Sequence, residues 1–197
     1  MNRQIIYRIN LLLLILSLIG CLLFAQNKRE QLIEDILTTS QNFNDIHRII
    51  PTLKKYPAII KYVPLGSPIK KKDNPILTSY FGNRYHPKDK EYKLHSGIDL
   101  QSEYATVIYA TADGNVLFAG RNGGYGKCVI IEHRYGYSTL YGHLTVYYTK
   151  KGKKVKKGDA IGFLGSTGKS TGNHLHYEII KNKVKTNPLD FYKRDED

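Results

Sequence analysis

The feature that most restricts the fold of this chain is a series of short apolar stretches that begins after Ile76 and is interrupted by glycine-rich turns. Each stretch is rich in β-branched and aromatic residues, a composition typical of strands. Short strands at regular spacing favour an antiparallel sheet or a barrel-like domain. The clearest stretches are Thr106–Ala110, Asn115–Phe118, Val129–Ile131 and Ser138–Tyr141. We therefore predict a mainly β domain, which we place over residues 63–192.

Residues 1–25 have the layout of a signal peptide or membrane anchor. Arg3 and Arg8 carry positive charge, with no acidic residue, ahead of the apolar run Leu11–Ala25. This run of about 15 residues is shorter than the roughly 20 that a membrane-spanning helix usually needs. Three alternatives stay open: cleavage after Ala25, lipidation of Cys21 in the sequence Leu-Ile-Gly-Cys, and retention as an uncleaved anchor. Each predicts an exported protein of the periplasm or cell envelope, with membrane attachment in the second and third cases.

The segment from residue 26 to residue 62 has a different pattern. Its apolar residues recur at helical spacing, which predicts one or two short amphipathic helices. Their apolar face is better explained by packing on the following domain than by a partner-binding surface. Proline and glycine residues between Pro64 and Pro75 then mark the entry to the β domain. Residues 193–197 are expected to form a polar tail.

The charge of the chain favours an anionic partner. There are 30 Lys and Arg residues against 17 Asp and Glu residues, which gives a formal net charge of +13. Nucleic acid, a membrane surface and an acidic cell wall would each suit this charge, so it does not choose among them. Only two cysteines exist, and Cys21 lies in the export signal, so no disulfide framework is available. Cys128 stands in an apolar run and is predicted to be a buried core residue.

Two segments contain residues that could bind a metal. His95 and Asp99 are four residues apart, and in a strand residues separated by an even number face the same side. This pair alone is a weak signal. Near the C-terminus, the same alternation places His174, His176 and Glu178 on one face of a strand. Two histidines and one carboxylate leave a fourth zinc position for water, which is the pattern of catalytic zinc sites.

Three motifs, taken together and in order, are specific enough to indicate a protein family. They are His95-x-x-x-Asp99, Tyr141-Gly-His143-Leu144 and the run from Gly165 that ends in His174-Leu-His176-Tyr-Glu178. In this order they resemble the lysostaphin-type, or LytM-type, metallopeptidases of family M23, and the likeness extends from about Ser79 to Pro188. The resemblance implies a barrel-sandwich-hybrid-like metallopeptidase fold of antiparallel sheet, with Zn2+ as the cofactor.

The resemblance also implies roles for individual residues. His95, Asp99 and His176 would bind zinc, and His143 and His174 would act on the substrate. One of these two histidines could take a proton from water while the other stabilises the oxyanion or protonates the leaving amine. Which histidine does which is open. Glu178 is either a group that orients a ligand or a structural carboxylate. The histidines expected to be structural are His47, His86 and His133.

The function that these expectations predict is hydrolysis of peptide cross-links in bacterial peptidoglycan. The D-alanyl–diaminopimelate bond is favoured over a glycyl-glycine bond, since no wall-targeting domain follows Pro188. The rival is a non-catalytic wall-binding or amidase-activating module of the same fold, which the intact ligand set disfavours. A phosphate-binding loop at Gly165–Thr171 is rejected because Phe163 stands where such a loop needs glycine. Peptidoglycan is the expected partner, and nucleic acid is not.

Overall fold

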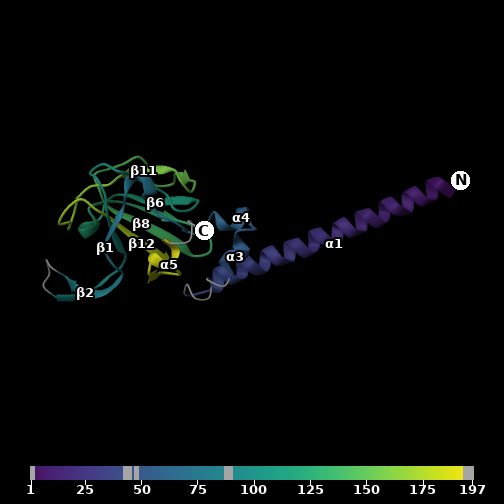
Figure 1. Cartoon of the computed structure of the whole chain (residues 1–197), viewed down its shortest axis with the longest axis horizontal. Coiled ribbons are helices and arrows are strands. Elements are labelled where there is room, and N and C mark those ends of the chain that lie inside the picture. The colour runs from purple at the N-terminus through teal and green to yellow at the C-terminus, as the bar shows by residue number, and fades with distance from the viewer. Residues whose placement is uncertain (1–2, 42–45, 47–48, 87–90, 193–197) are drawn as a thin grey trace. The chain divides into compact units, whose positions relative to one another are not determined.

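The computed structural model describes residues 3–41, 46, 49–86 and 91–192. The chain divides into two compact units, Met1–Thr39 and Ser40–Asp197. The first unit is a single helix, α1 (Arg3–Thr39), which can be followed in Figure 1. Within it, Leu11–Thr39 is long and apolar enough to cross a membrane, a test that an N-terminal signal sequence also passes.

The helical segment differs from the prediction at residues 26–39. These residues do not form a short separate helix but continue α1 without a break at Ala25. The physical reason is that α1 contains no proline, and its one glycine, Gly20, costs only about 1 kcal/mol in a helix interior. The prediction of short helices is correct for the later part of this segment, where α3 (Ile50–Leu53) and α4 (Pro57–Ile60) each have proline in the first turn. The predicted tail at residues 193–197 lies outside the described residues.

The second unit is built from short strands. Besides α3 and α4, its described residues form 3-10 turns at Lys71–Asp73 and Gly123–Tyr125 and the helix α5 (Leu189–Tyr192). The strands are β1 (Ile76–Ser79), β2 (Gly82–His86), β3 (Glu91–His95), β4 (Ile98–Gln101), β5 (Val107–Tyr109), β6 (Gly114–Arg121), β7 (Lys127–Glu132), β8 (Tyr137–Leu144), β9 (Val146–Tyr147), β10 (Lys154–Val155), β11 (Ala160–Phe163), β12 (Leu175–Lys181) and β13 (Val184–Thr186).

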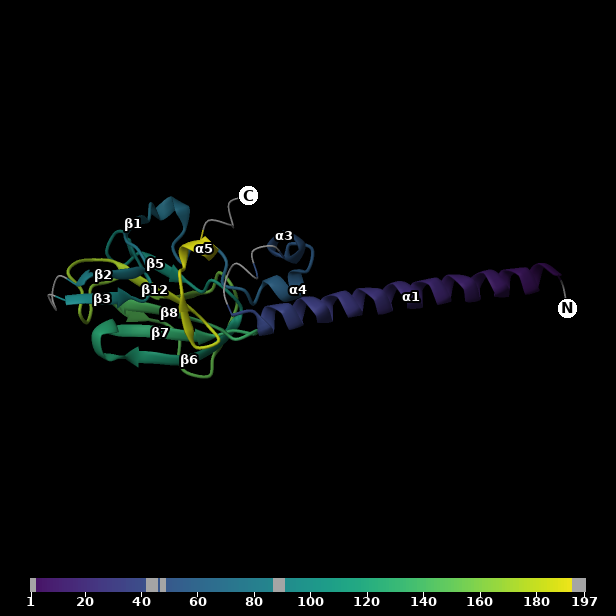
Figure 2. The ribbon, with the colours of Figure 1, turned by 90° about the horizontal axis from the view of Figure 1, so that it is seen from below.

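These strands form antiparallel sheets, so the predicted mainly β fold is confirmed. The largest sheet has the order β1-β4-β12-β8-β7-β6-β10, with β13 paired to β12. Figure 2 shows β12, β8, β7 and β6 of this sheet side by side. A second sheet has the order β5-β11-β9, and β2 and β3 form a separate hairpin. The four stretches predicted from the sequence correspond to β5, β6, β7 and β8.

Strand β12 connects the core to the site. On one face, Leu175, Tyr177 and Ile179 are fully buried. The ring of Tyr177 packs on that of Tyr141 on β8, with 5.3 Å between the centroids, and both hydroxyls hydrogen-bond the Thr111 side chain. Because side chains alternate along a strand, this packing directs the intervening residues of β12 to the other face. The predicted alternation from His174 to Glu178 is therefore confirmed.

Candidate metal centre and catalytic site

The register of the large sheet brings Asp99 and His176 side by side. Asp99 on β4 pairs directly with His176 on β12. On its other side β12 pairs with β8, where Gly142 lies opposite His176 and His143 follows. Three strands in the middle of the sheet therefore carry three of the predicted site residues.

His95 reaches the same place from the hairpin of β2 and β3. It is the last residue of β3, and a bend at Ser96 and Gly97 separates it from β4. Any side chain at residue 97 would collide with the backbone carbonyl of Tyr177, so glycine lets this bend pack against β12. The prediction that His95 and Asp99 share one strand is wrong, because two strands carry them and the bend turns them toward each other.

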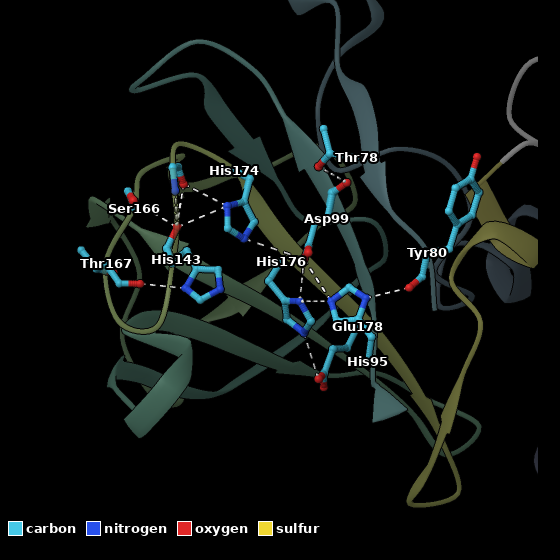
Figure 3. A network of polar contacts seen from close by, with 12 residues as sticks. Thr78, Tyr80, His95, Asp99, His143, Ser166, Thr167, His174, His176 and Glu178 are labelled. Carbon is cyan, nitrogen blue, oxygen red and sulfur yellow. Dashed lines mark hydrogen bonds and ion pairs between the residues drawn. The ribbon is translucent and has the colours of Figure 1, made fainter. Parts of the chain in front are cut away.

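Three potential ligand atoms converge at this point (Figure 3). Nε2 of His95 lies 3.2 Å from Oδ1 of Asp99 and 3.1 Å from Nδ1 of His176. Nδ1 of His176 lies 2.9 Å from the same Asp99 oxygen. Zinc binds its ligands at about 2.0–2.2 Å in a tetrahedron, which separates neighbouring ligand atoms by about 3.3 Å. The triangle has the dimensions of one face of such a site and leaves a fourth position open.

The hydrogen bonds of the two histidines show that lone pairs point into this triangle. Nδ1 of His95 donates to the carbonyl oxygen of Tyr80 at 2.7 Å. Nε2 of His176 donates to Oε1 of Glu178 at 3.1 Å. A neutral imidazole has one N–H, so the ring nitrogens that face Asp99 have none. Two lone pairs and a carboxylate at this distance repel one another unless a cation lies among them, and their donor types suit zinc.

The charges around His176 also favour a cation. Burial raises the pKa of Asp99, but the rings of His176 and His95, which would donate hydrogen bonds to it when protonated, lower it more, so the pKa lies well below its usual range. Burial lowers the pKa of His176, but the hydrogen bonds that the protonated ring would donate to Asp99 and Glu178 outweigh this and raise it. The two carboxylates therefore stabilise positive charge between them. A metal cation would supply that charge in place of a proton.

Glu178 is buried behind His176 and accepts several hydrogen bonds. Its Oε1 accepts the His176 N–H and the hydroxyls of Ser96 and Tyr125, the last at 2.8 Å. Its Oε2 pairs with the ammonium of Lys185. Burial raises the pKa of Glu178, but the bonds from His176, Lys185 and Ser96 lower it to about 2. These contacts favour the first of the two interpretations of Glu178, a carboxylate that orients a histidine ligand.

Replacing Glu178 is expected to weaken zinc binding. We expect about a tenfold loss of zinc affinity for Glu178→Gln, which keeps an acceptor for His176, and up to about 100-fold for Glu178→Ala. Competition with a chromogenic chelator measures this affinity. The exposed Glu132 on β7 provides a matched control, and Glu132→Gln should bind zinc as the wild type does. Unchanged affinity in both Glu178 variants would mean that this carboxylate is only structural.

His143 and His174 lie beside the triangle with their rings held by backbone carbonyls. Nδ1 of His143 donates to the carbonyl of Thr167 at 2.7 Å, and Nδ1 of His174 donates to that of Gly172 at 2.9 Å. Their ring centroids are 4.7 Å apart, and Nε2 of His174 lies 3.8 Å from Oδ1 of Asp99. In each neutral ring Nε2 therefore carries the lone pair that can accept a proton. Burial lowers the pKa of His143 to about 4, which keeps this ring neutral at pH 7.

His143 reaches this face through an uncommon backbone conformation. Its φ of 60° lies in the left-handed region, which residues other than glycine seldom adopt. In a regular strand His143 would face away from the side shared by Gly142 and His176. The left-handed turn redirects the side chain toward His174, as Figure 3 shows. Backbone strain of this kind is often found at functional sites.

The four histidines and Asp99 line a cleft of about 490 Å³. Arg84 lines it too, and one of its Nη atoms lies 3.5 Å from Oδ2 of Asp99. Sequence reasoning assigned no role to Arg84, Tyr125 or Lys185. Arg84 falls within the segment of resemblance, which could have drawn attention to it. Nothing in the sequence around Tyr125 and Lys185 indicates that they meet at Glu178.

The remaining histidines and Cys128 were predicted to be structural. His133 hydrogen-bonds the Asp113 carbonyl and the Thr139 hydroxyl, is buried away from the cleft and has its pKa lowered by burial to about 4. Cys128 is fully buried, and burial together with Glu178 raises its pKa to about 11, so the thiol stays protonated. Both predictions are confirmed. The side chain of His86 and all of His47 lie outside the described residues.

Comparisons with known proteins agree with this geometry. The sequence profile described as Peptidase family M23 matches residues 93–188. The chain is 47% identical to the DD-carboxypeptidase/endopeptidase Mpg of Neisseria meningitidis over 113 residues. The aligned region covers 57% of this chain and 26% of Mpg. The chain is 34% identical over 128 residues to the peptidoglycan DD-endopeptidase ShyB of Vibrio cholerae, covering 65% of this chain and 29% of ShyB. The chain thus spans about a quarter of the length of these curated relatives.

A comparison with solved structures also indicates a metallopeptidase. A zinc containing peptidase from Vibrio cholerae matches with a TM-score of 0.59 and 32% sequence identity, over 64% of this chain and 39% of that one. The match includes the fold as well as the sequence. From its motifs, its fold and these relatives, the chain belongs to peptidase family M23.

Proposed function

We propose that this chain is an exported zinc metallo-endopeptidase that hydrolyses peptide cross-links of bacterial peptidoglycan. One observation carries the proposal: ligand atoms of His95, Asp99 and His176 converge beside two further histidines in one cleft. A structural zinc site is closed by four protein ligands, whereas three ligands and an open position suit catalysis. The intact set also argues against the rival of a non-catalytic wall-binding or amidase-activating module.

The proposed chemistry is divided between the metal and the histidines. Zinc bound at this site supplies Lewis acidity, which polarises a carbonyl and lowers the pKa of water toward neutrality. Nε2 of His143 or His174 then accepts the proton of the attacking water. The other ring stabilises the negative charge on the carbonyl oxygen or delivers a proton to the leaving amine. With 4.7 Å between the two ring centroids, both can reach one scissile bond.

The relatives support the class of substrate. ShyB is named a peptidoglycan DD-endopeptidase, and Mpg is named a DD-carboxypeptidase/endopeptidase. We extend this to the present chain and propose the bond between D-alanine and diaminopimelate as the one preferred over glycyl-glycine. The formal net charge of +13 would favour binding to an anionic wall polymer.

Digestion of purified sacculi tests the proposal. The full-length protein, kept in detergent because of α1 and loaded with zinc, should convert cross-linked muropeptide dimers of diaminopimelate-type sacculi to monomers. His174→Ala serves as the inactive control. Release of stem peptides from the glycan would identify an amidase and overturn the proposal. Cleavage of pentaglycine bridges alone would overturn only the preferred bond, and failure to cleave any sacculus would favour the wall-binding rival.

The N-terminal helix and its charge support the proposed export. We expect the unit from Ser40 to Asp197 to face the cell wall, because Arg3 and Arg8 precede a helix apolar enough to enter a membrane. Protease added to spheroplasts with intact inner membranes should digest this unit, while a cytoplasmic marker protein stays protected. A protected unit with an untrimmed N-terminus would contradict export.

A further inference from the structure

The cleft has an excess of positive charge. Arg84, Lys93 and Lys169 line it, whereas Asp99 is the one acidic side chain among its described lining residues. Arg84 and Lys93 are direct partners across β2 and β3, and Gly82 pairs with His95 two residues along. Because residues two apart on a strand share a face, both cations lie on the face of the hairpin that carries His95. This face therefore presents positive charge next to the proposed metal ligands.

Arg84 is the cation with unused hydrogen-bond donors. Lys93 is occupied by Glu91, whose Oε1 lies 2.5 Å from its Nζ. Arg84 has a looser contact, 3.5 Å from Nη to Oδ2 of Asp99, and its Nε is buried with no hydrogen-bond partner in the described structure. The Arg84 side chain as a whole is 34% exposed and lines the cleft, so an acceptor on a substrate can reach the accessible part of its guanidinium.

The position of Arg84 relates it to the reacting groups. Oδ1 of Asp99 faces His174, at 3.8 Å from Nε2, and Oδ2 of the same carboxylate faces Arg84. The guanidinium and the proposed proton-transfer residue are thus separated by one carboxylate group. A substrate whose scissile amide lies at the metal site and His174 would place groups only a few bonds from that amide within reach of Arg84.

We propose that Arg84 binds a free carboxylate on the leaving-amine side of the substrate and so determines which peptide bonds are cut. The inference rests on the proposed function and refines its substrate class. In a bond from D-alanine to the D-centre of diaminopimelate, the carbon next to the scissile nitrogen carries a free carboxylate, two bonds from that nitrogen. In a glycyl-glycine bridge the corresponding carboxyl group is part of the next peptide bond. A guanidinium binds a carboxylate through two parallel hydrogen bonds, and it cannot bind an amide in the same way.

A pair of substrates that differ only in this carboxylate tests the inference. Two synthetic cross-linked dimers are needed, one with the free carboxylate beside the scissile bond and one with its carboxamide. Zinc-loaded full-length wild type should prefer the free carboxylate by about 30-fold in kcat/KM, the effect of losing a charged hydrogen-bonded pair. Arg84→Gln should lose about 30-fold on the carboxylate dimer and less than about threefold on the carboxamide. Arg84→Lys should be intermediate, because it keeps the charge without the paired donors.

The controls separate this role from others. Lys151→Gln removes a charge from an exposed turn outside the cleft and should leave both values of kcat/KM unchanged. Zinc content of Arg84→Gln should equal that of the wild type. A loss of zinc, or an equal loss of rate on both dimers, would mean that Arg84 acts by positioning Asp99, and the inference would be wrong. Equal wild-type rates on both dimers would also overturn it while leaving the proposed function intact, whereas no cleavage of either dimer or of sacculi would overturn that function as well.

Discussion

His176→Ala is expected to remove stoichiometric zinc and to lower peptidase turnover by at least about 1000-fold. The imidazole supplies one of three converging ligand atoms, 2.9 Å from Asp99 and 3.1 Å from His95. Zinc contributes several kcal/mol to catalysis through Lewis acidity, and each 1.36 kcal/mol is a factor of ten in rate. Elemental analysis of the purified protein measures the metal, and release of muropeptide monomers from sacculi measures the activity.

The variant is expected to fold, so that loss of zinc can be interpreted. Glu178 would keep its bonds from Lys185, Ser96 and Tyr125 when the His176 ring is absent. Asp99→Asn offers a second variant of almost the same shape that replaces the charged ligand by a neutral amide. It should also lose most of its zinc, with an unchanged circular dichroism spectrum. A folded His176→Ala protein that retains one zinc per chain would show that the zinc binds elsewhere.

The part of the site that could be predicted is the part that depends on strand alternation. His174, His176 and Glu178 share a face because Leu175, Tyr177 and Ile179 are fully buried on the other one. When the apolar side chains of a strand all lie on one face, its sequence alternates between apolar and polar residues, and this alternation can be recognised without a structure. The same reasoning predicted the mainly β fold and the positions of β5 to β8, since those strands are rich in β-branched and aromatic residues and the turns that separate β6, β7 and β8 contain glycine.

The rest depends on backbone bends and on contacts between distant segments. The bend at Ser96 and Gly97 splits His95 from Asp99, and the left-handed φ of 60° at His143 reverses the face of its side chain. Neither conformation follows from residue spacing, because each is fixed by packing against another strand. The contact of Arg84 with Asp99 similarly requires the hairpin of β2 and β3 to lie beside β4. The spacing of residues along the chain therefore predicts which side chains could bind a metal. It does not predict which side chains from distant segments they contact.

His143 and His174 are expected to behave differently from the proposed ligands. Replacing either should leave one zinc per chain and lower kcat by at least about 100-fold, the usual contribution of a general acid or base. The physical reason is that their Nδ1 atoms are bonded to the carbonyls of Thr167 and Gly172, so that Nε2 serves the substrate. Rates on cross-linked dimers and zinc content, measured on the same preparations, separate the two kinds of residue.

The backbone at residue 143 decides which variant is informative. Alanine at a φ of 60° is strained, whereas asparagine adopts this region more readily, so His143→Asn removes the ring with less risk to the fold. His174→Ala needs no such precaution, because His174 is not among the described residues with positive φ. If the two rings divide the work of base and acid, the double variant should be only slightly slower than the slower single one, since residues that act as a unit are not additive. Loss of zinc in His143→Asn or His174→Ala, or a kcat near that of the wild type, would contradict the proposed roles.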